Sequence, residues 1–179
     1  RIDRILARVI TIDGEVAARG FPLPAVGDWV TVGPPADDAE FSDMVVTDVL
    51  PRWSVLERLD PLSSRQDVDT VQVLATNIDL VMICAPLDRE VSIARIEREL
   101  VVAWESGATP LVVLTKADRN PTSELITRDL TERLIGVQVI CTAATRGLGI
   151  DEIRTLVAPG VTGALLGASG AGKSTLTNA

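Results

Sequence analysis

The sequence predicts a small all-β barrel of the OB type, followed by a partial α/β domain with a parallel sheet and a phosphate-binding loop. Short strand-like runs separated by turn residues fill the first third of the chain, and strand and helix patterns alternate from residue 77 onwards. Residues 167–174 read Gly-Ala-Ser-Gly-Ala-Gly-Lys-Ser, which fits the pattern G-x-x-x-x-G-K-[ST] at every fixed position. These three observations predict the fold class.

The N-terminal segment, residues 1–62, has a sequence pattern typical of a small β-barrel. A β-branched run ends at Asp13-Gly14, a dipeptide typical of tight turns. The clearest expected strands are residues 7–12, 28–32, 44–50 and 54–56. About five short strands in a segment of this length suit a closed barrel of the OB type.

Four aromatic side chains of this segment allow two interpretations. Phe21, Trp29, Phe41 and Trp53 either fill the barrel core or stack on nucleic-acid bases. We favour the core, because small barrels commonly use aromatic residues to fill their interior.

Residues 63–76 are expected to connect the barrel to an α/β domain over residues 77–179. Apolar runs predict parallel strands, and apolar residues at helical spacing, such as Ile93, Ile96 and Leu100, predict helices between them. The expected strands are residues 79–85, 110–114, 137–141 and 161–166, and the expected helices are residues 93–104, 120–134 and 150–157. Ligands bind at the carboxyl ends of such strands, where the motifs of this chain lie.

The glycine-rich loop supplies what phosphate oxygens require. Gly167, Gly170 and Gly172 allow positive φ angles that turn successive N–H groups inward. The Lys173 ammonium is suited to bind between two phosphates, and the Ser174 hydroxyl is suited to a Mg²⁺ shell. The sequence therefore predicts a nucleotide phosphate site.

A second motif, Thr115-Lys116-Ala117-Asp118, follows an apolar strand. The Asp118 carboxylate is an acceptor that matches the adjacent N1–H and 2-amino donors of guanine, and the Lys116 stem can lie along a base plane. The phosphate loop follows this motif and ends five residues before Ala179, so we expect a rearranged domain whose remaining half lies outside this sequence.

The composition disfavours several classes of function. The net charge of −8 disfavours binding of polyanions by charge alone, and no apolar run is long enough to span a bilayer. Two cysteines and no histidine cannot form a closed four-ligand zinc site. No signal-peptide pattern follows Arg1, so we expect a cytoplasmic protein, and we also expect a monomer. Because the sequence does not begin with Met, we expect it to start inside a longer gene product.

The order of the motifs resembles the circularly permuted, ribosome small-subunit-dependent GTPase A family (RsgA/YjeQ-like). Residues 115–118, then Thr142-Ala143, then residues 167–174 follow the rotated order of that family. The barrel and residues 50–58, Leu-Pro-Arg-Trp-Ser-Val-Leu-Glu-Arg, also look similar. The resemblance implies an OB-fold barrel followed by a circularly permuted P-loop GTPase domain that this sequence contains only in part.

The resemblance also implies roles for individual residues. The expected guanine-binding residues are Thr115, Lys116, Asp118, Thr142 and Ala143, with the Ala143 N–H directed at guanine O6. The expected phosphate-binding residues are Gly167, Gly170, Ala171, Gly172, Lys173, Ser174 and Thr175, with Ser174 on Mg²⁺. The family usually has Asn in place of Thr115 and often Lys in place of Ala144.

For function, the resemblance implies a factor in small ribosomal subunit assembly that binds GTP or GDP with Mg²⁺, hydrolyses GTP and contacts ribosomal RNA. The catalytic switch segments and a Zn²⁺-binding tail would lie beyond this sequence. We therefore expect residues 1–179 to bind nucleotide weakly and to be deficient in hydrolysis. Two alternatives stay open: an ATP-binding P-loop protein, and a non-catalytic OB-fold RNA-binding module.

Overall fold

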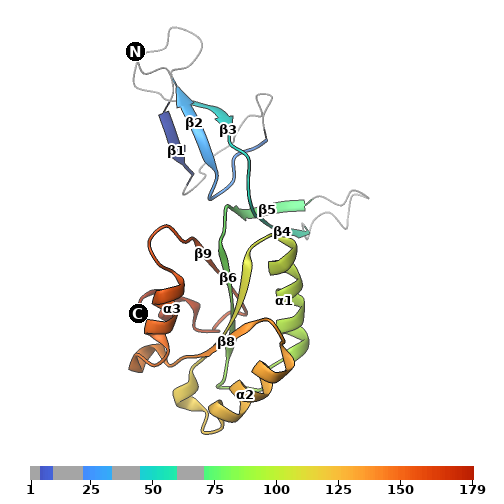
Figure 1. The fold of residues 1–179 in the computed structure, drawn as a ribbon, viewed down its shortest axis with the longest axis vertical. Helices are drawn as coiled ribbons and strands as arrows, with labels where there is room; N and C mark the ends of the chain where they lie inside the picture. Colours follow the sequence, from blue (N-terminus) through green and yellow to red (C-terminus); the bar gives the residue numbers. More distant parts are fainter. Residues whose placement is uncertain (1–4, 10–21, 34–44, 60–70) are drawn as a thin grey trace. The chain divides into compact units, whose positions relative to one another are not determined.

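A computed structural model describes residues 5–9, 22–33, 45–59 and 71–179 of the chain. The chain divides into two compact units, residues Arg1–Asn77 and Ile78–Ala179. The first unit is all-β and OB-like, and the second is a partial α/β domain with a parallel sheet (Figure 1). Within the described residues, no helix is both long and apolar enough to cross a membrane.

The first unit contains two antiparallel sheets. Strands β1 (Ile5–Arg8), β2 (Trp29–Gly33) and β3 (Val45–Val49) pair in that order. Strand β4 (Val55–Leu59) pairs with β5 (Val71–Thr76). The expected turn at Asp13-Gly14 lies outside the described residues.

Strand β5 occupies the last six residues of the segment that the sequence predicts as a connector. Gln72 and Leu74 are exposed, whereas Val73 and Ala75 are half-buried, so the segment has the alternation of a strand with one covered face. The run is short and directly follows the mostly polar residues 63–70, which is why its pattern is easily assigned to a linker. The first compact unit consequently extends to Asn77.

The aromatic residues of this unit do not share one environment. Trp29 is half-buried, and the Arg8 guanidinium lies 5.5 Å from the centre of its ring. Trp53 is 55% exposed, so its side chain is not the core residue that the sequence suggests. Phe21 and Phe41 lie outside the described residues.

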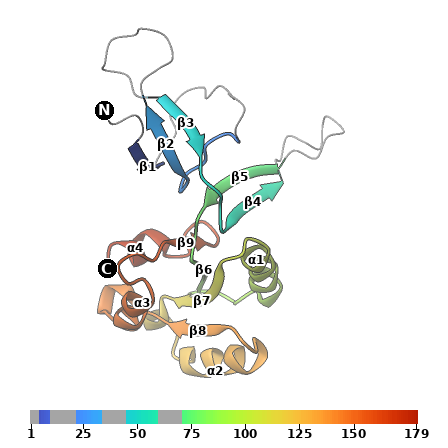
Figure 2. The same cartoon turned by 45° about the horizontal axis from the view of Figure 1, so that its top comes forward.

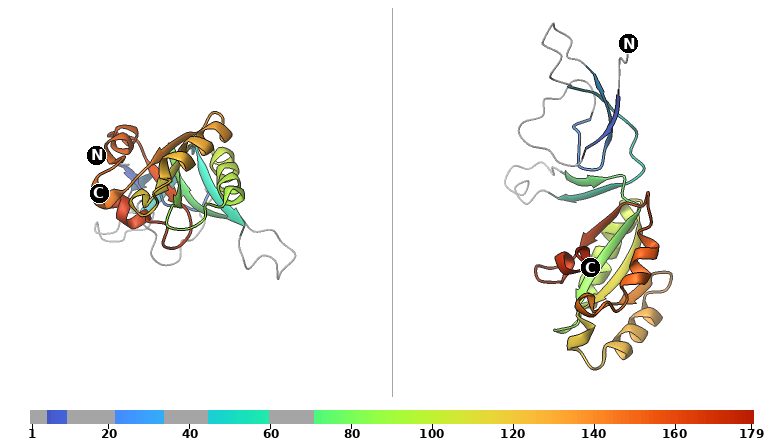
Figure 3. Two further views of the ribbon diagram at one scale, coloured as in Figure 1. Left: turned by 90° about the horizontal axis from the view of Figure 1, so that it is seen from below. Right: turned by 90° about the vertical axis from the view of Figure 1, so that its left-hand side faces the viewer.

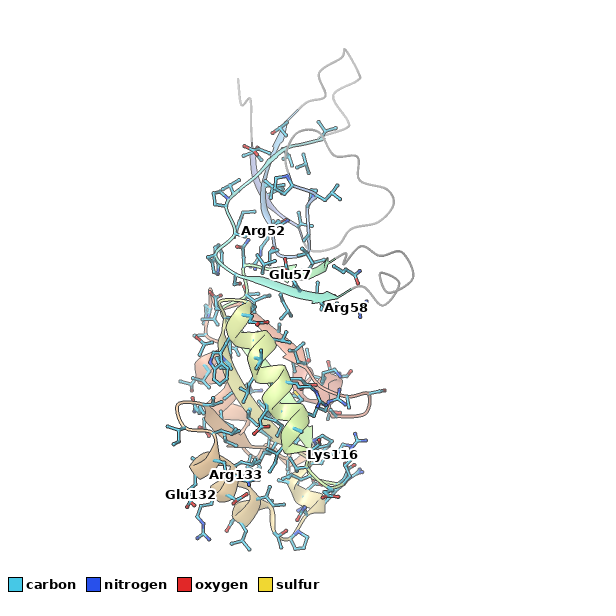
Figure 4. The ribbon with its side chains drawn as sticks, turned by 90° about the vertical axis from the view of Figure 1, so that its right-hand side faces the viewer. Arg52, Glu57, Arg58, Lys116, Glu132 and Arg133 are labelled. Atoms are coloured by element: carbon cyan, nitrogen blue, oxygen red, sulfur yellow. The ribbon has the colours of Figure 1, made fainter. Side chains whose placement is uncertain are left out.

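A buried ion pair joins distant parts of the first unit. Asp28 is fully buried, and Arg52 binds both of its carboxylate oxygens, at 2.8 Å through Nε and at 2.7 Å through Nη2. The Thr76 hydroxyl and the Ala25 N–H also donate to this carboxylate, each at 2.7 Å. Arg52 lies in the segment between β3 and β4 (Figure 4), so one carboxylate ties together segments that are far apart in sequence.

The second unit is built on four parallel strands in the order β8-β7-β6-β9 (Figure 2). The strands are β6 (Leu80–Pro86), β7 (Thr109–Thr115), β8 (Gln138–Cys141) and β9 (Gly163–Leu166). The helices are α1 (Ile93–Glu105), α2 (Ser123–Arg133), α3 (Ile150–Leu156) and α4 (Lys173–Thr177), with single 3₁₀ turns η2 (Ala117–Arg119) and η3 (Ala144–Arg146).

Helices α1 and α2 lie on one face of this sheet, and α3 and α4 lie on the other (Figure 2). Side chains of β6 and β7 point alternately to the two faces, and both strands are buried along most of their length. One core forms where Met82, Cys84 and Val113 pack with Ile153 of α3 and Leu176 of α4. On α1, the buried residues are Ile96, Leu100 and Ala103.

Strand β9, which leads into the phosphate-binding loop, is an edge strand paired only with β6 among the described strands (Figure 3). All four of its residues are half-buried, in contrast to the buried neighbouring strand. The Asp79 carboxylate accepts a hydrogen bond from the Thr162 N–H at 2.7 Å, which fixes the entry to β9 beside the entry to β6.

We predict that Arg52→Met lowers the free energy of unfolding of the first unit by about 3 kcal/mol at neutral pH, because it leaves the buried Asp28 charge without its ionic partner. Fluorescence-monitored denaturation in a Trp104→Phe background reports this unit, because Trp29 and Trp53 are then the remaining tryptophans. Arg58→Met, which removes an exposed hydrogen bond to Gln72, is the matched control.

The Asp28–Arg52 ion pair also predicts how the stability of the first unit depends on pH. Burial raises the pKa of the Asp28 carboxyl, but hydrogen bonds from Arg52, Thr76 and Ala25 outweigh burial and hold this pKa below its ordinary value of 3.8. The carboxylate therefore contributes its full stabilisation above pH 3.8 and loses it as the pH falls through the lower folded-state pKa. The stability difference between wild type and Arg52→Met should shrink over that acid range; a difference that grows there would contradict the assignment.

Candidate nucleotide-binding site

Four loops meet at one edge of the parallel sheet because they leave the carboxyl ends of neighbouring strands. In the register, Pro86 of β6 lies beside Thr115 of β7, and Leu114 of β7 lies beside Cys141 of β8. On the other side of β6, Ile83 lies beside Leu166 at the end of β9. The loops that follow, residues 87–92, 115–120, 142–149 and 167–172, therefore converge.

The loop after β7 is fixed to the loop after β8. Lys116 adopts a left-handed conformation with φ 60° and ψ 36°, which turns the chain sharply into η2. The Ala117 N–H then donates to the Thr142 carbonyl at 3.0 Å. Thr142 is fully buried, and both its N–H and its hydroxyl donate to the Leu114 carbonyl. These bonds hold two of the predicted base-binding segments side by side.

Thr115 connects the same loop to the phosphate-binding loop. Its buried hydroxyl donates to the Ala171 carbonyl at 2.6 Å. A Cβ placed on Gly172 would lie 3.3 Å from this hydroxyl oxygen, so the two loops are packed closely. A threonine therefore makes a direct link between these two loops.

The phosphate-binding loop depends on glycine where it passes the sheet. Gly167 has a φ of 134°, and a Cβ at this position would lie 2.5 Å from the Cys84 carbonyl oxygen. Any side chain there would collide with the backbone of β6. At the other end, Gly172 has a φ of 89° and precedes Lys173, the first residue of α4.

The side chains that the sequence assigns to phosphate and Mg²⁺ lie in and beyond this loop. The Lys173 ammonium donates to the carbonyls of Gly167 and Ala168, at 2.8 and 2.9 Å, and so folds back across its own loop. Gly170, Ser174 and Thr175 are exposed, whereas Ala171 is buried. Among the described residues, no group of three or more His, Cys, Asp or Glu side chains is placed to hold a metal ion.

Two hollows adjoin along these loops. The smaller, of about 100 Å³, has Lys116, Asp118 and Thr142 in its wall. The larger, of about 450 Å³, is formed by residues 169–175 together with Lys116 and Arg119. Both are lined by Lys116, Arg119, Gly172 and Thr175. The structure thus places Asp118 in the smaller hollow, which we call the base compartment, and Lys173 in the larger, which we call the phosphate compartment. The two compartments share a wall.

In the loop after β8, the Ala143 N–H has a hydrogen-bond partner within its own loop. The Ala143 N–H donates to the Leu148 carbonyl at 3.1 Å, and Ala143 is buried. Ala144 and Thr145, not Ala143, line the smaller hollow. The Ala143 N–H is therefore engaged within its own loop, a short antiparallel bridge that the sequence pattern does not reveal.

The β6–α1 loop adds residues that the sequence analysis did not select. The Asp88 carboxylate accepts a hydrogen bond from the Lys116 ammonium at 2.6 Å, and Asn120 donates to the Leu87 carbonyl at 2.9 Å. The Lys116 ammonium holds the pKa of the Asp88 carboxyl below its ordinary value. Asp88 lies shortly after the expected strand of residues 79–85 and so at the same edge of the sheet, but no sequence pattern indicates its contact with Lys116.

Cys84 lies close to this arrangement but has the environment of an unreactive thiol. Cys84 is buried beneath the phosphate-binding loop, and burial raises the pKa of its thiol to about 12. Cys141 is half-buried and free. A thiol with so high a pKa stays protonated at neutral pH, as a buried small apolar residue would.

Comparison with known proteins identifies related chains. A sequence model of the RsgA GTPase family matches residues 49–179. A protein of Lactiplantibacillus plantarum called small ribosomal subunit biogenesis GTPase RsgA 2 is 40% identical over 162 residues, which cover 90% of this chain and 44% of the relative. The RsgA protein of Streptomyces coelicolor is 40% identical over 190 residues, which cover 100% of this chain and 49% of the relative.

Two solved structures share the fold. YjeQ from Thermotoga maritima matches with a TM-score of 0.67 and 27% identity, over 87% of this chain and 50% of that one. YloQ, described as a circularly permuted GTPase, matches in fold with a TM-score of 0.61 and 23% identity, over 88% and 50%. The chain thus spans about half the length of the relatives that it matches.

We predict that Thr115→Val lowers the free energy of unfolding of the second unit by roughly 1–2 kcal/mol, because it leaves the Ala171 carbonyl without its side-chain donor at nearly unchanged volume. Chemical denaturation followed by Trp104 fluorescence in a Trp29→Phe, Trp53→Phe background measures this loss. Thr155→Val is the matched control, since its exposed hydroxyl bonds only to its own helix at Asp151. Equal stabilities of the two variants would show that the link between the loops contributes nothing.

Proposed function

Because this chain belongs to the RsgA GTPase family, we propose that its parallel-sheet loops bind GTP or GDP and that the whole protein hydrolyses GTP during small ribosomal subunit assembly. The relatives named small ribosomal subunit biogenesis GTPases support the biological role. The adjoining hollows, with Asp118 in one, Lys173 in the other and Lys116 in both, support the nucleotide site.

In this proposal Asp118 selects the base. Its side chain is exposed in the smaller hollow, and the described part of the chain offers its carboxylate no hydrogen-bond donor. Guanine presents two adjacent N–H donors that one carboxylate can accept, whereas adenine presents no such pair at that edge. The apolar stem of Lys116 would lie along the base, with Thr115 and Thr142 fixing the loops behind it.

The phosphates would occupy the larger hollow. Residues 167–175 would surround them with backbone N–H groups, and the Lys173 ammonium would exchange its two carbonyl partners for phosphate oxygens. The Ser174 hydroxyl would hold Mg²⁺ together with the phosphates, an arrangement that Mg²⁺ accepts because it needs few protein ligands. Bound Mg²⁺ would neutralise phosphate charge.

Hydrolysis requires groups outside these residues. Phosphoryl transfer depends on a positioned water and on electrostatic stabilisation of the transferred group. We place the switch segments, the catalytic residue and a Zn²⁺-binding part in the half of the protein that its relatives have and this chain does not cover. The OB-like unit would contact ribosomal RNA, and the exposed Trp53 is a side chain suited to stacking on a base. A cytoplasmic, monomeric protein fits this role.

The ATP-binding alternative predicts a different base site. Adenine presents one donor, its 6-amino group, beside the N1 acceptor, so a carboxylate could accept only one hydrogen bond at that edge. Guanine presents two adjacent donors, and Asp118 lines the hollow next to the phosphate loop. The proposal for guanine is therefore favoured because guanine would use both carboxylate oxygens of this side chain.

We predict that Asp118→Asn weakens GDP binding by about 100-fold, because the substitution replaces one acceptor oxygen with a donor opposite the two N–H donors of guanine. Xanthosine diphosphate, which carries a carbonyl at position 2, should bind the variant better than the wild type. Titration calorimetry with both nucleotides measures the exchange, with Asp151→Asn on α3 as the control. Unchanged GDP affinity in Asp118→Asn would refute the base assignment.

We also predict that full-length protein hydrolyses GTP and is stimulated by small ribosomal subunits, whereas residues 1–179 alone turn over GTP at or near the rate of the uncatalysed reaction. Phosphate release assays on both proteins at equal concentration decide this. Robust turnover by residues 1–179 would show that the catalytic groups lie in this chain after all.

A further inference from the structure

We propose that Asp88 is a positioning residue of the nucleotide site, which holds the Lys116 ammonium away from the phosphates so that the lysine stem forms a fixed wall of the base compartment. The inference rests on the proposed function, because it concerns the same site. It adds a residue from the β6–α1 loop, a segment outside the motifs that the sequence analysis identified.

The contact between the two side chains is short and directed. The Lys116 ammonium lies 2.6 Å from the Asp88 Oδ2 atom, and both side chains are about one-quarter exposed, at 26% and 25%. Arg119 approaches the same oxygen at 3.8 Å. The two cationic neighbours favour the charged carboxylate and outweigh the opposing effect of partial burial, so the bond persists at neutral pH.

The backbone that carries Asp88 is itself fixed to the base loop. The Leu87 N–H donates to the Thr115 carbonyl at 2.8 Å, and the Asn120 side chain donates to the Leu87 carbonyl at 2.9 Å. Leu87 is buried, at 2% exposure. Asp88 therefore occupies a defined place beside Lys116 rather than the tip of a free loop.

Lys116 has two places where its ammonium could bind. It lines the base compartment with Asp118 and also the phosphate compartment with residues 169–175. A lysine stem is flexible, and phosphate oxygens attract its ammonium strongly. The Asp88 carboxylate, which lines neither compartment, offers the ammonium a competing partner and so leaves the phosphates to Lys173. Figure 4 shows Lys116 near the N-terminal end of α1.

The adjacent residue approaches the phosphate-binding loop. The Arg89 guanidinium lies 3.4 Å from the Ser169 carbonyl oxygen. The β6–α1 loop thus contacts the base loop through Leu87 and Asp88 and the phosphate-binding loop through Arg89. A residue in this loop is well placed to affect nucleotide binding without direct contact with the nucleotide.

A double-mutant cycle in the full-length protein tests the proposal. GDP affinity is measured by calorimetry for wild type, Asp88→Ala, Lys116→Met and the double variant. Methionine keeps an unbranched apolar stem and removes the charge. We expect Asp88→Ala to weaken GDP binding about three- to fivefold, the range of a partly exposed ion pair, and to have no effect when Lys116 is already Met. Asp88→Glu should recover part of the loss, because it keeps the charge.

Asp151→Ala is the matched control, since it removes another exposed carboxylate with an arginine partner, Arg154, at 3.3 Å. Its GDP affinity should equal that of wild type. Equal losses from Asp88→Ala in both Lys116 backgrounds, or no loss in either, would overturn the positioning role while leaving the proposed function intact. If the wild type itself fails to bind GDP, the proposed function and the positioning role are both wrong.

A second measurement does not depend on nucleotide. The Asp88 carboxyl is surrounded by Lys116, Arg89 and Arg119, and the first of these contributes most to its lowered pKa. A carboxyl NMR titration should show that this pKa rises towards its ordinary value in Lys116→Met and stays low in Lys173→Met. The same pKa in wild type and Lys116→Met would show that the ion pair is absent in solution.

Discussion

The parallel register of the four-stranded sheet is the constraint on which the site depends. Because β6, β7, β8 and β9 run in the same direction, the chain leaves each strand at the same edge. Residues separated by more than 50 positions in sequence therefore meet, as the bond from Thr115 to the Ala171 carbonyl shows. The strands are buried by helices on both faces, so the register cannot slip without exposing apolar side chains.

Hydrogen bonds between the loops fix the positions of the segments that the strand register brings together. The loop after β7 bonds to the loops after β6, β8 and β9 through Thr115 and Ala117, and the Lys116–Asp88 pair adds an ionic contact. Each bond satisfies a polar group that would otherwise be left in a closely packed region. The OB-like unit has a similar arrangement, because the buried Asp28 carboxylate accepts hydrogen bonds from Arg52, Thr76 and Ala25. In both units, a few polar contacts join segments that hydrophobic burial alone would leave loosely placed.

Sequence patterns were most informative where burial is two-sided. The strands of the parallel sheet and helices α1, α2 and α3 lie close to where apolar runs and helical spacing place them, because continuous burial leaves a strong pattern. Helix α2 begins at Ser123, after the residues Asn120-Pro121 that mark its start in sequence. The residues of strand β5 are expected to belong to a connector, because a short strand that directly follows the mostly polar residues 63–70 resembles the end of a linker. The Ala143 bridge and the Asp88 contact could not be predicted, since both depend on loop geometry that no local pattern records.

The central claim is that one guanine nucleotide spans both compartments. Amide NMR spectra of ¹⁵N-labelled residues 1–179, titrated separately with GDP, guanosine and pyrophosphate, test it most directly, and they tolerate weak binding. The account predicts that GDP shifts the signals of residues 115–119, 144–145 and 167–174 along one binding curve, that guanosine shifts the first two sets, and that pyrophosphate shifts the third. GDP shifts confined to a single loop, or separate binding curves for the base and phosphate loops, would contradict it.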